Sequence, residues 1–242
     1  MDVTNASEKL PLVGRIVAVF EVLLCSDYPT QLAVGATLYA IGLRPMTASG
    51  TLSLRYVVAL SLIDTALLIA LICFFIRAHR ERVRDVLLGR RSALREAEFG
   101  MPLTIGALLV ALAAIGAVRF FAPSLHNLEH NPLQDVIHGP RDAALFALVV
   151  VVAGGIREEV QRAFILHRFS VWLGGPALGL LLSSVAFGLG HRLQGNDVAI
   201  ATGVLGVYWG AVYLWRRSCI APMVSHAGFN LIEVLQYFLI GR

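Results

Sequence analysis

The stretch Arg157-Glu158-Glu159-Val160-Gln161-Arg162 places four charged side chains within an apolar run. Residues 143–153 before it contain only Ala, Leu, Phe and Val, and residues 163–166 after it are Ala-Phe-Ile-Leu. The run is long enough to enter a bilayer as a helix, where four charges facing lipid would cost roughly 10 kcal/mol in total. The charges must therefore face a bundle interior or a water-filled cavity, which indicates a functional site. The alternative is a buried ion-pair lock between helices.

The composition predicts an all-α, polytopic transmembrane bundle of seven to eight membrane helices. Hydrophobic residues make up 57% of the 242 residues, and charged residues only 15%, against about 25% in soluble domains. The mean hydropathy is +0.73. Three cysteines argue against a disulfide framework or a cysteine zinc cluster. The net charge of +4 is typical of the positive-inside bias, and no nucleic-acid motif accompanies it, so the lipid bilayer is the expected partner rather than nucleic acid.

Hydropathy along the chain divides it into two parts. Residues 1–142 are predicted to form amino-terminal membrane helices with a basic cytoplasmic loop at 77–98, and residues 143–242 a catalytic helical core. Residues 1–10 carry no cleavable signal pattern. Asp64 is a charged residue inside the apolar segment 56–76, and we expect it to pack against a neighbouring helix. The main helices are expected at about residues 31–43, 56–76, 102–121, 143–168, 177–192, 198–215 and 222–240.

Two of these later helices also carry polar residues at helical spacing. Phe187 and His191 lie one turn apart, as do His226 and Asn230. A single histidine in such a helix is more often a core residue than a catalyst. Three helices that each bring polar groups favour convergence, because each group would cost free energy alone and the groups satisfy one another together.

Such a group of side chains can activate water. A glutamate can act as general base, a histidine can orient the water or pass on a proton, and His226 with Asn230 can donate hydrogen bonds to an oxyanion. The combination fits amide hydrolysis without a nucleophilic serine or cysteine. The same atoms could instead hold zinc through Glu158, His191 and His226, with water as the fourth ligand.

A second histidine motif lies in the expected outer loop. Residues 126–130 match the H-x-x-E-H pattern of inverted zincins. That chemistry needs both histidines on one stable helix, whereas this loop is bounded by prolines. We therefore interpret the motif as a loop feature rather than a catalytic site.

The three motifs together resemble the CPBP family, which contains type II CAAX prenyl endopeptidases and bacteriocin-processing intramembrane proteases. The family pattern is a glutamate pair followed by arginine, then F-x-x-x-H, then H-x-x-x-N. The resemblance covers roughly residues 143–242 and implies an all-helical fold. It implies that Glu158 is the base, that Glu159 is structural and paired with an arginine, and that His191 assists the water. His226 and Asn230 would form the oxyanion site.

The chain departs from the family pattern at the arginine. The family arginine usually follows the second glutamate after three residues, but here that position is Ala163 and Arg162 comes one residue early. The base assignment therefore stays open between Glu158 and Glu159. We prefer Glu158, because Arg162 still reaches both carboxylates at i+4 and i+3.

The sequence as a whole predicts an intramembrane endopeptidase with no cofactor, or with zinc in the alternative. Its substrate would be a membrane-tethered protein or peptide, of the prenylated CAAX type by family association. The expected location is a bacterial cytoplasmic membrane. The alternative function is a catalytically inactive immunity or scaffold protein of the same fold.

Overall fold

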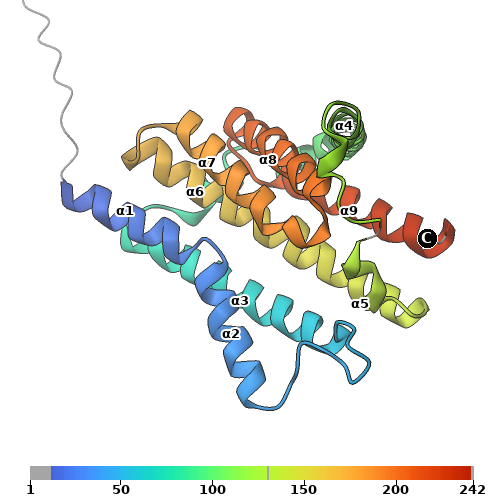
Figure 1. The fold of residues 1–242 in the computed structure, drawn as a ribbon. Helices are drawn as coiled ribbons and strands as arrows, with labels where there is room; N and C mark the ends of the chain where they lie inside the picture. The colour runs from blue at the N-terminus through green and yellow to red at the C-terminus, as the bar shows by residue number, and fades with distance from the viewer. Residues whose placement is uncertain (1–11, 130, 241–242) are drawn as a thin grey trace, which may run out of the picture.

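The computed structural model describes residues 12–129 and 131–240, which fold into helices joined by short turns (Figure 1). Residues 1–10, for which no signal peptide is predicted, and His130 of the loop motif lie outside the described residues. The prediction of an all-helical, polytopic membrane fold is confirmed. The helices are α1 (Leu12–Leu24), α2 (Tyr28–Ala40), α3 (Leu54–Ala78), α4 (Ala93–Phe121), α5 (Pro140–Val149), α6 (Glu158–Trp172), α7 (Pro176–Gly190), α8 (Asn196–Arg216) and α9 (Ile220–Ile240).

Helix length and hydropathy identify an integral membrane protein. Within the described residues, four helical segments are long and apolar enough to cross a bilayer: Leu54–Ala78, Arg84–Phe121, Asn196–Arg216 and Ile220–Ile240. The apolar α7 has only 15 residues, and α1 and α2 have 13 each. These lengths are below the roughly 20 residues that a span needs. By this criterion four spans are counted, against the seven to eight membrane helices expected.

The centre of the fold is the helical rod formed by α5, η4 (Val150–Arg157) and α6. Pro140 begins the rod at a position where a proline costs no hydrogen bond. The sequence predicts one uninterrupted helix here, but η4 is a π-helix that ends immediately before the acidic pair. Figure 1 shows the rod running through the bundle, with α3 along it and α7 and α8 beside α6.

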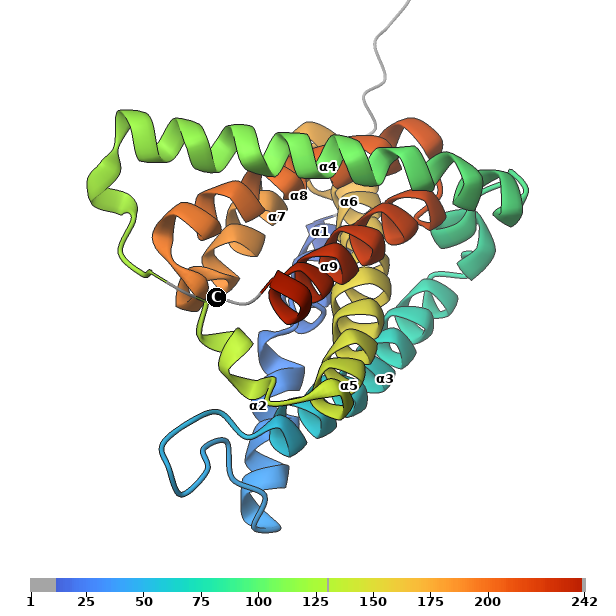
Figure 2. The same cartoon turned by 90° about the vertical axis from the view of Figure 1, so that its right-hand side faces the viewer.

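Helix α4 packs across two other helices of the bundle. Figure 2 shows it running past both α8 and α9. Gly100 allows the backbones to approach closely, because a Cβ there would lie 2.6 Å from the Ala221 carbonyl oxygen. At the same end, the buried Glu96 accepts a hydrogen bond of 2.6 Å from Arg216 of α8. Apolar packing and one ion pair therefore fix α4 to the carboxy-terminal helices.

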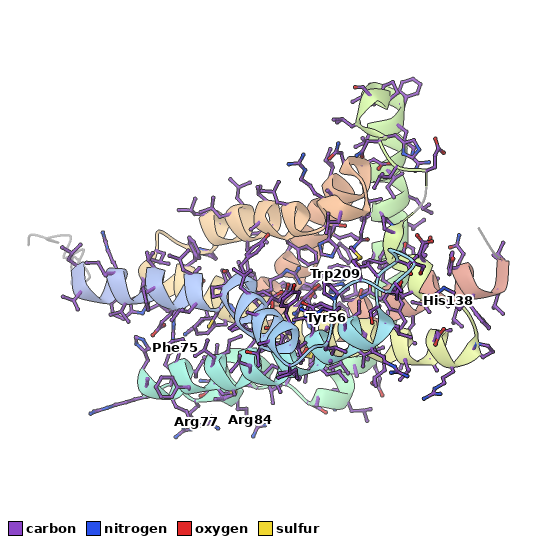
Figure 3. All side chains as sticks on the ribbon, turned by 60° about the horizontal axis from the view of Figure 1, so that its bottom comes forward. Tyr56, Phe75, Arg77, Arg84, His138 and Trp209 are labelled. Carbon is purple, nitrogen blue, oxygen red and sulfur yellow. The ribbon has the colours of Figure 1, made fainter. Side chains whose placement is uncertain are left out.

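The predicted basic loop is shorter than expected. A π-turn, η1 (Arg84–Leu88), follows α3, and α4 begins at Ala93 rather than near Pro102. The capping position Ser92 has an extended backbone, which allows this earlier helix start. Figure 3 shows Arg77 and Arg84 pointing away from the bundle at its edge. The loop from Ala122 to Gly139 contains the 3-10 turns η2 (Pro123–Leu125) and η3 (Pro132–Val136).

Candidate functional site

The two adjacent glutamates at the start of α6 have different surroundings. Glu159 is 1% exposed, and its carboxylate is paired with Arg162 on the next turn. His226 Nδ1 lies 2.8 Å from the same Glu159 oxygen, so Nδ1 carries the hydrogen of that bond. Glu159 is therefore held by a neighbour on its own helix and by one on α9.

Aromatic rings fix the position of His226. Trp209 stacks on the imidazole with ring centroids 3.7 Å apart, and its indole N–H donates to Ser225 Oγ at 3.1 Å. Trp209 is 1% exposed and lies in the interior of the bundle (Figure 3). The stacking leaves His226 little freedom to turn, so its Nε2 stays on the side opposite Glu159.

Glu158 lies at the wall of a cavity. Its Oε2 is 3.8 Å from His226 Nε2, and its Oε1 is 3.4 Å from Arg157 Nη2. Its side chain is 14% exposed, against 1% for Glu159. Glu158 is thus the member of the pair that borders the cavity.

The cavity has a volume of about 270 Å³ and is bordered by the α1–α2 turn, the start of α6 and the end of α7. His191, the residue after α7, borders it, and its Nδ1 is 2.8 Å from the Phe187 carbonyl oxygen. That contact makes Nδ1 the donor and leaves Nε2 as an acceptor in the neutral ring. The lining residues used below are Asp27, Arg157, Glu158, Arg162, Phe187 and His191.

Phe187 connects the predicted site residues to one another. Its ring centroid lies 4.7 Å from that of His191 and 6.1 Å from that of His226. The Arg162 guanidinium stands 4.6 Å above the same ring, a cation–π contact. The F-x-x-x-H motif therefore provides a ring that separates the two imidazoles and covers the arginine.

Asn230 lies apart from the cavity. Its side-chain amide donates to the Val150 carbonyl at 3.2 Å, and it is absent from the lining that the described residues form. Helix α9 brings His226 to Glu158, but one turn later it directs Asn230 to η4. The structure thus places Glu158 and His191 on the cavity, His226 beside Glu158 but outside the lining that the described residues form, and Asn230 against the π-helix.

The zinc alternative would need Glu158, His191 and His226 as three ligands of one ion. Across residues 12–129 and 131–240, no group of three His, Cys, Asp or Glu side chains is arranged to hold a metal ion. His226 Nδ1 is engaged by Glu159, which leaves Nε2 as its free nitrogen. Cys25, Cys73 and Cys219 are free thiols.

The structure also adds a group of residues that sequence reasoning did not assign to the site. Arg157 Nη1 lies 2.6 Å from Asp64 Oδ2 on α3 and 2.9 Å from Asp27 Oδ1 in the α1–α2 turn. Asp64 packs against a neighbouring helix as predicted, and its partner there is Arg157. Burial raises the pKa of Asp27 to about 8 in spite of the opposing charge of Arg157, and the nearby Asp64 adds to the rise. The sequence does carry a signal for these two residues, because Asp27 and Asp64 are carboxylates that interrupt apolar segments.

The loop motif at residues 126–130 has a different environment. His126 Nδ1 lies 2.8 Å from Asp197 Oδ2 at the start of α8, and Arg119 donates to the same oxygen at 3.0 Å. His126 follows a 3-10 turn rather than lying on a helix. These contacts attach the loop to α8.

Comparison with known proteins gives one family match. Residues 140–232 match the family model described as type II CAAX prenyl endopeptidase Rce1-like. The match contains all three motifs and begins within three residues of the predicted start of the core at 143. The family resemblance inferred from the motifs is therefore confirmed for this segment. No match is found among curated proteins or among solved structures.

Proposed function

From the relationship of residues 140–232 to type II CAAX prenyl endopeptidases, we propose that the chain is an intramembrane endopeptidase that uses a glutamate-activated water. The family supports a protease, and the apolar helices support a bilayer location. The observation that carries the proposal is the contact of Glu158 with both the cavity and His226. A substrate attached to the membrane, such as a lipid-modified protein or peptide, would enter this cavity.

In the proposed reaction, Glu158 takes a proton from a water molecule in the cavity as the water attacks the peptide carbonyl. His191 Nε2, across the same cavity, accepts a hydrogen bond from that water and orients it. His226, held by Glu159 and Trp209, already donates from Nδ1 to Glu159, so an oxyanion role for it would require the imidazolium form, with a second hydrogen on Nε2. Glu158 then returns the proton to the leaving amine. Asn230 would join the oxyanion site only by leaving the Val150 carbonyl.

The test is cleavage of a membrane-tethered reporter by the purified protein in liposomes. Glu158→Gln keeps the shape of the side chain but cannot accept the proton, so we expect cleavage to fall at least about 100-fold with an unchanged thermal midpoint. Unchanged cleavage would remove the proposal. A lower midpoint with unaltered processing in cells would instead support the alternative of an inactive immunity or scaffold protein.

A chelator arm addresses the zinc alternative. If cleavage persists after dialysis against a strong chelator, the reaction proceeds as written above. If cleavage is lost and returns on addition of zinc, the side chains must rearrange to bind the metal.

A further inference from the structure

Three carboxylates share one guanidinium beside the cavity. Arg157 contacts Asp64 at 2.6 Å, Asp27 at 2.9 Å and Glu158 at 3.4 Å. The Asp64 carboxylate is fully buried, and the Arg157 side chain is 7% exposed. The two shortest contacts go to residues in the amino-terminal half of the chain, and the longest goes to Glu158.

The hydrogen bonds around Arg157 explain why this contact is the longest. Nη1 is shared by Asp27 and Asp64, whereas Nη2 is directed to Glu158. The two aspartates therefore fix the plane of the guanidinium and limit how closely it can approach Glu158. If they did not compete, Arg157 would pair with Glu158 directly, and a carboxylate in a close bidentate pair is a poor base.

We propose that Asp64 and Asp27 are positioning residues that act through Arg157 to keep the Glu158 carboxylate basic and directed to the cavity. The inference rests on the proposed function, because it assigns a base role to Glu158. It also makes α3 and the α1–α2 turn part of the site, although both lie outside the matched segment 140–232.

Other charged groups also surround Glu158. On α6 these are Glu159 and Arg162, which are paired with each other. From α9 comes His226, 3.8 Å from the Glu158 carboxylate, and from the end of α7 comes His191 on the same cavity. A change at Asp64 leaves these four groups in place, so its effect on Glu158 comes from the lost Asp64 charge and from the release of Arg157.

The experiment measures the dependence of kcat and KM on pH for reporter cleavage in liposomes. Asp64→Asn removes one negative neighbour and frees Arg157 for Glu158, and both changes favour the ionised carboxylate. We expect the acidic limb of the kcat profile to move to lower pH by about one unit, and the plateau to fall roughly tenfold because the base is weaker. KM should not change. Asp27→Leu, which removes the second acceptor of Arg157 Nη1, should move the limb in the same direction, and Arg157→Gln should move it to higher pH.

The matched control is Glu96→Gln, which removes another buried carboxylate paired with an arginine, Arg216, on α4 and α8. A purely structural role for Asp64 would lower the thermal midpoint without moving the pH limb, as we expect for the control. If the limb and the plateau of both aspartate variants stay at wild-type values while Glu158→Gln is inactive, the inference is wrong and the proposed function stands. An active Glu158→Gln overturns both. Should Asp64→Asn fail to fold, Asp27→Leu decides the question.

Discussion

The adjacent residues Glu158 and Glu159 show how two identical side chains acquire different properties. Glu159 is enclosed by Arg162, His226 and the stacked Trp209, whereas Glu158 borders the cavity. A buried carboxylate with two cationic or polar partners has a structural task, because losing it leaves a buried charge without compensation. A carboxylate at a cavity wall can exchange protons with bound water.

Replacing Glu159 should therefore affect stability before chemistry. Glu159→Gln leaves Arg162 buried against the rings of Phe187 and Trp209, and it weakens the bond to His226. We expect a loss of about 3 kcal/mol in the free energy of unfolding, measured by denaturant titration in micelles. Glu158→Gln should lose less than 1 kcal/mol by the same measurement. If Glu158→Gln instead loses much more stability than Glu159→Gln, the roles of the two glutamates are reversed.

The sequence could predict the pair but not the difference between its members. Spacing puts Arg162 within reach of both carboxylates, so helical geometry alone leaves the base open. The environments differ because of His226, which lies 67 positions after Glu159 in the chain and meets it only through the packing of α9. Asn230 illustrates the same limit, since one turn of α9 is enough to place it on η4 rather than at the cavity.

The π-helix η4 leads into the acidic pair and packs against α9 and α3. Its residues, mainly valine, alanine and glycine, give no sign of π geometry, so the sequence predicts a regular helix. π-turns are often found at functional sites, and η4 ends at the residue before Glu158. Gly155 of η4 lies against α9, where a Cβ would be 2.7 Å from Ala227 Cβ and 3.0 Å from its Cα.

A methyl group at Gly155 should therefore displace α9. Because Ala227 follows His226, the shift would move the imidazole away from both glutamates. We expect Gly155→Ala to lower the free energy of unfolding by about 1–3 kcal/mol and to reduce cleavage of the reporter. Gly116→Ala near the end of α4 is the control, since nothing lies within 4 Å of a Cβ at that position. Equal stability of the two variants would show that α9 does not rest on η4 as described.

At the scale of the whole molecule, the sequence predicted the carboxy-terminal helices better than their connection to the amino-terminal half. The expected helices at 177–192 and 198–215 correspond to α7 and α8 with ends shifted by at most two residues, and Pro176, Gly190 and Gly195 mark three of the four ends. Ion pairs between distant segments carry no such local signal. Arg168 of α6, for example, donates to Glu21 of α1 at 2.6 Å and to Glu81 after α3 at 2.5 Å.

The ion pairs of Glu81 predict how the stability of the assembled bundle depends on pH. Burial alone would raise the pKa of Glu81, but hydrogen bonds from His167 and Arg168, together with their charges, lower it to about 2. A carboxyl group with a lowered pKa stabilises the folded state above its ordinary value of 4.5, and this contribution is lost as the pH falls from 4.5 to about 2. His79 lies near the same cluster through Glu21, at 2.7 Å.

Glu81→Gln should therefore lower the thermal midpoint at pH 7 by about 2 °C, a small change because the group is partly exposed and screened. The difference from the wild type should shrink below pH 4.5 and vanish near pH 2. Midpoints measured in micelles across this range test the expectation, with Glu98→Gln on the exposed face of α4 as a control that should match the wild type throughout. A difference that persists unchanged at pH 2 would mean that packing of the side chain, rather than its charge, joins α3 to α6. A difference that follows the titration would show that electrostatic attraction between the two halves of the chain contributes to holding the bundle together.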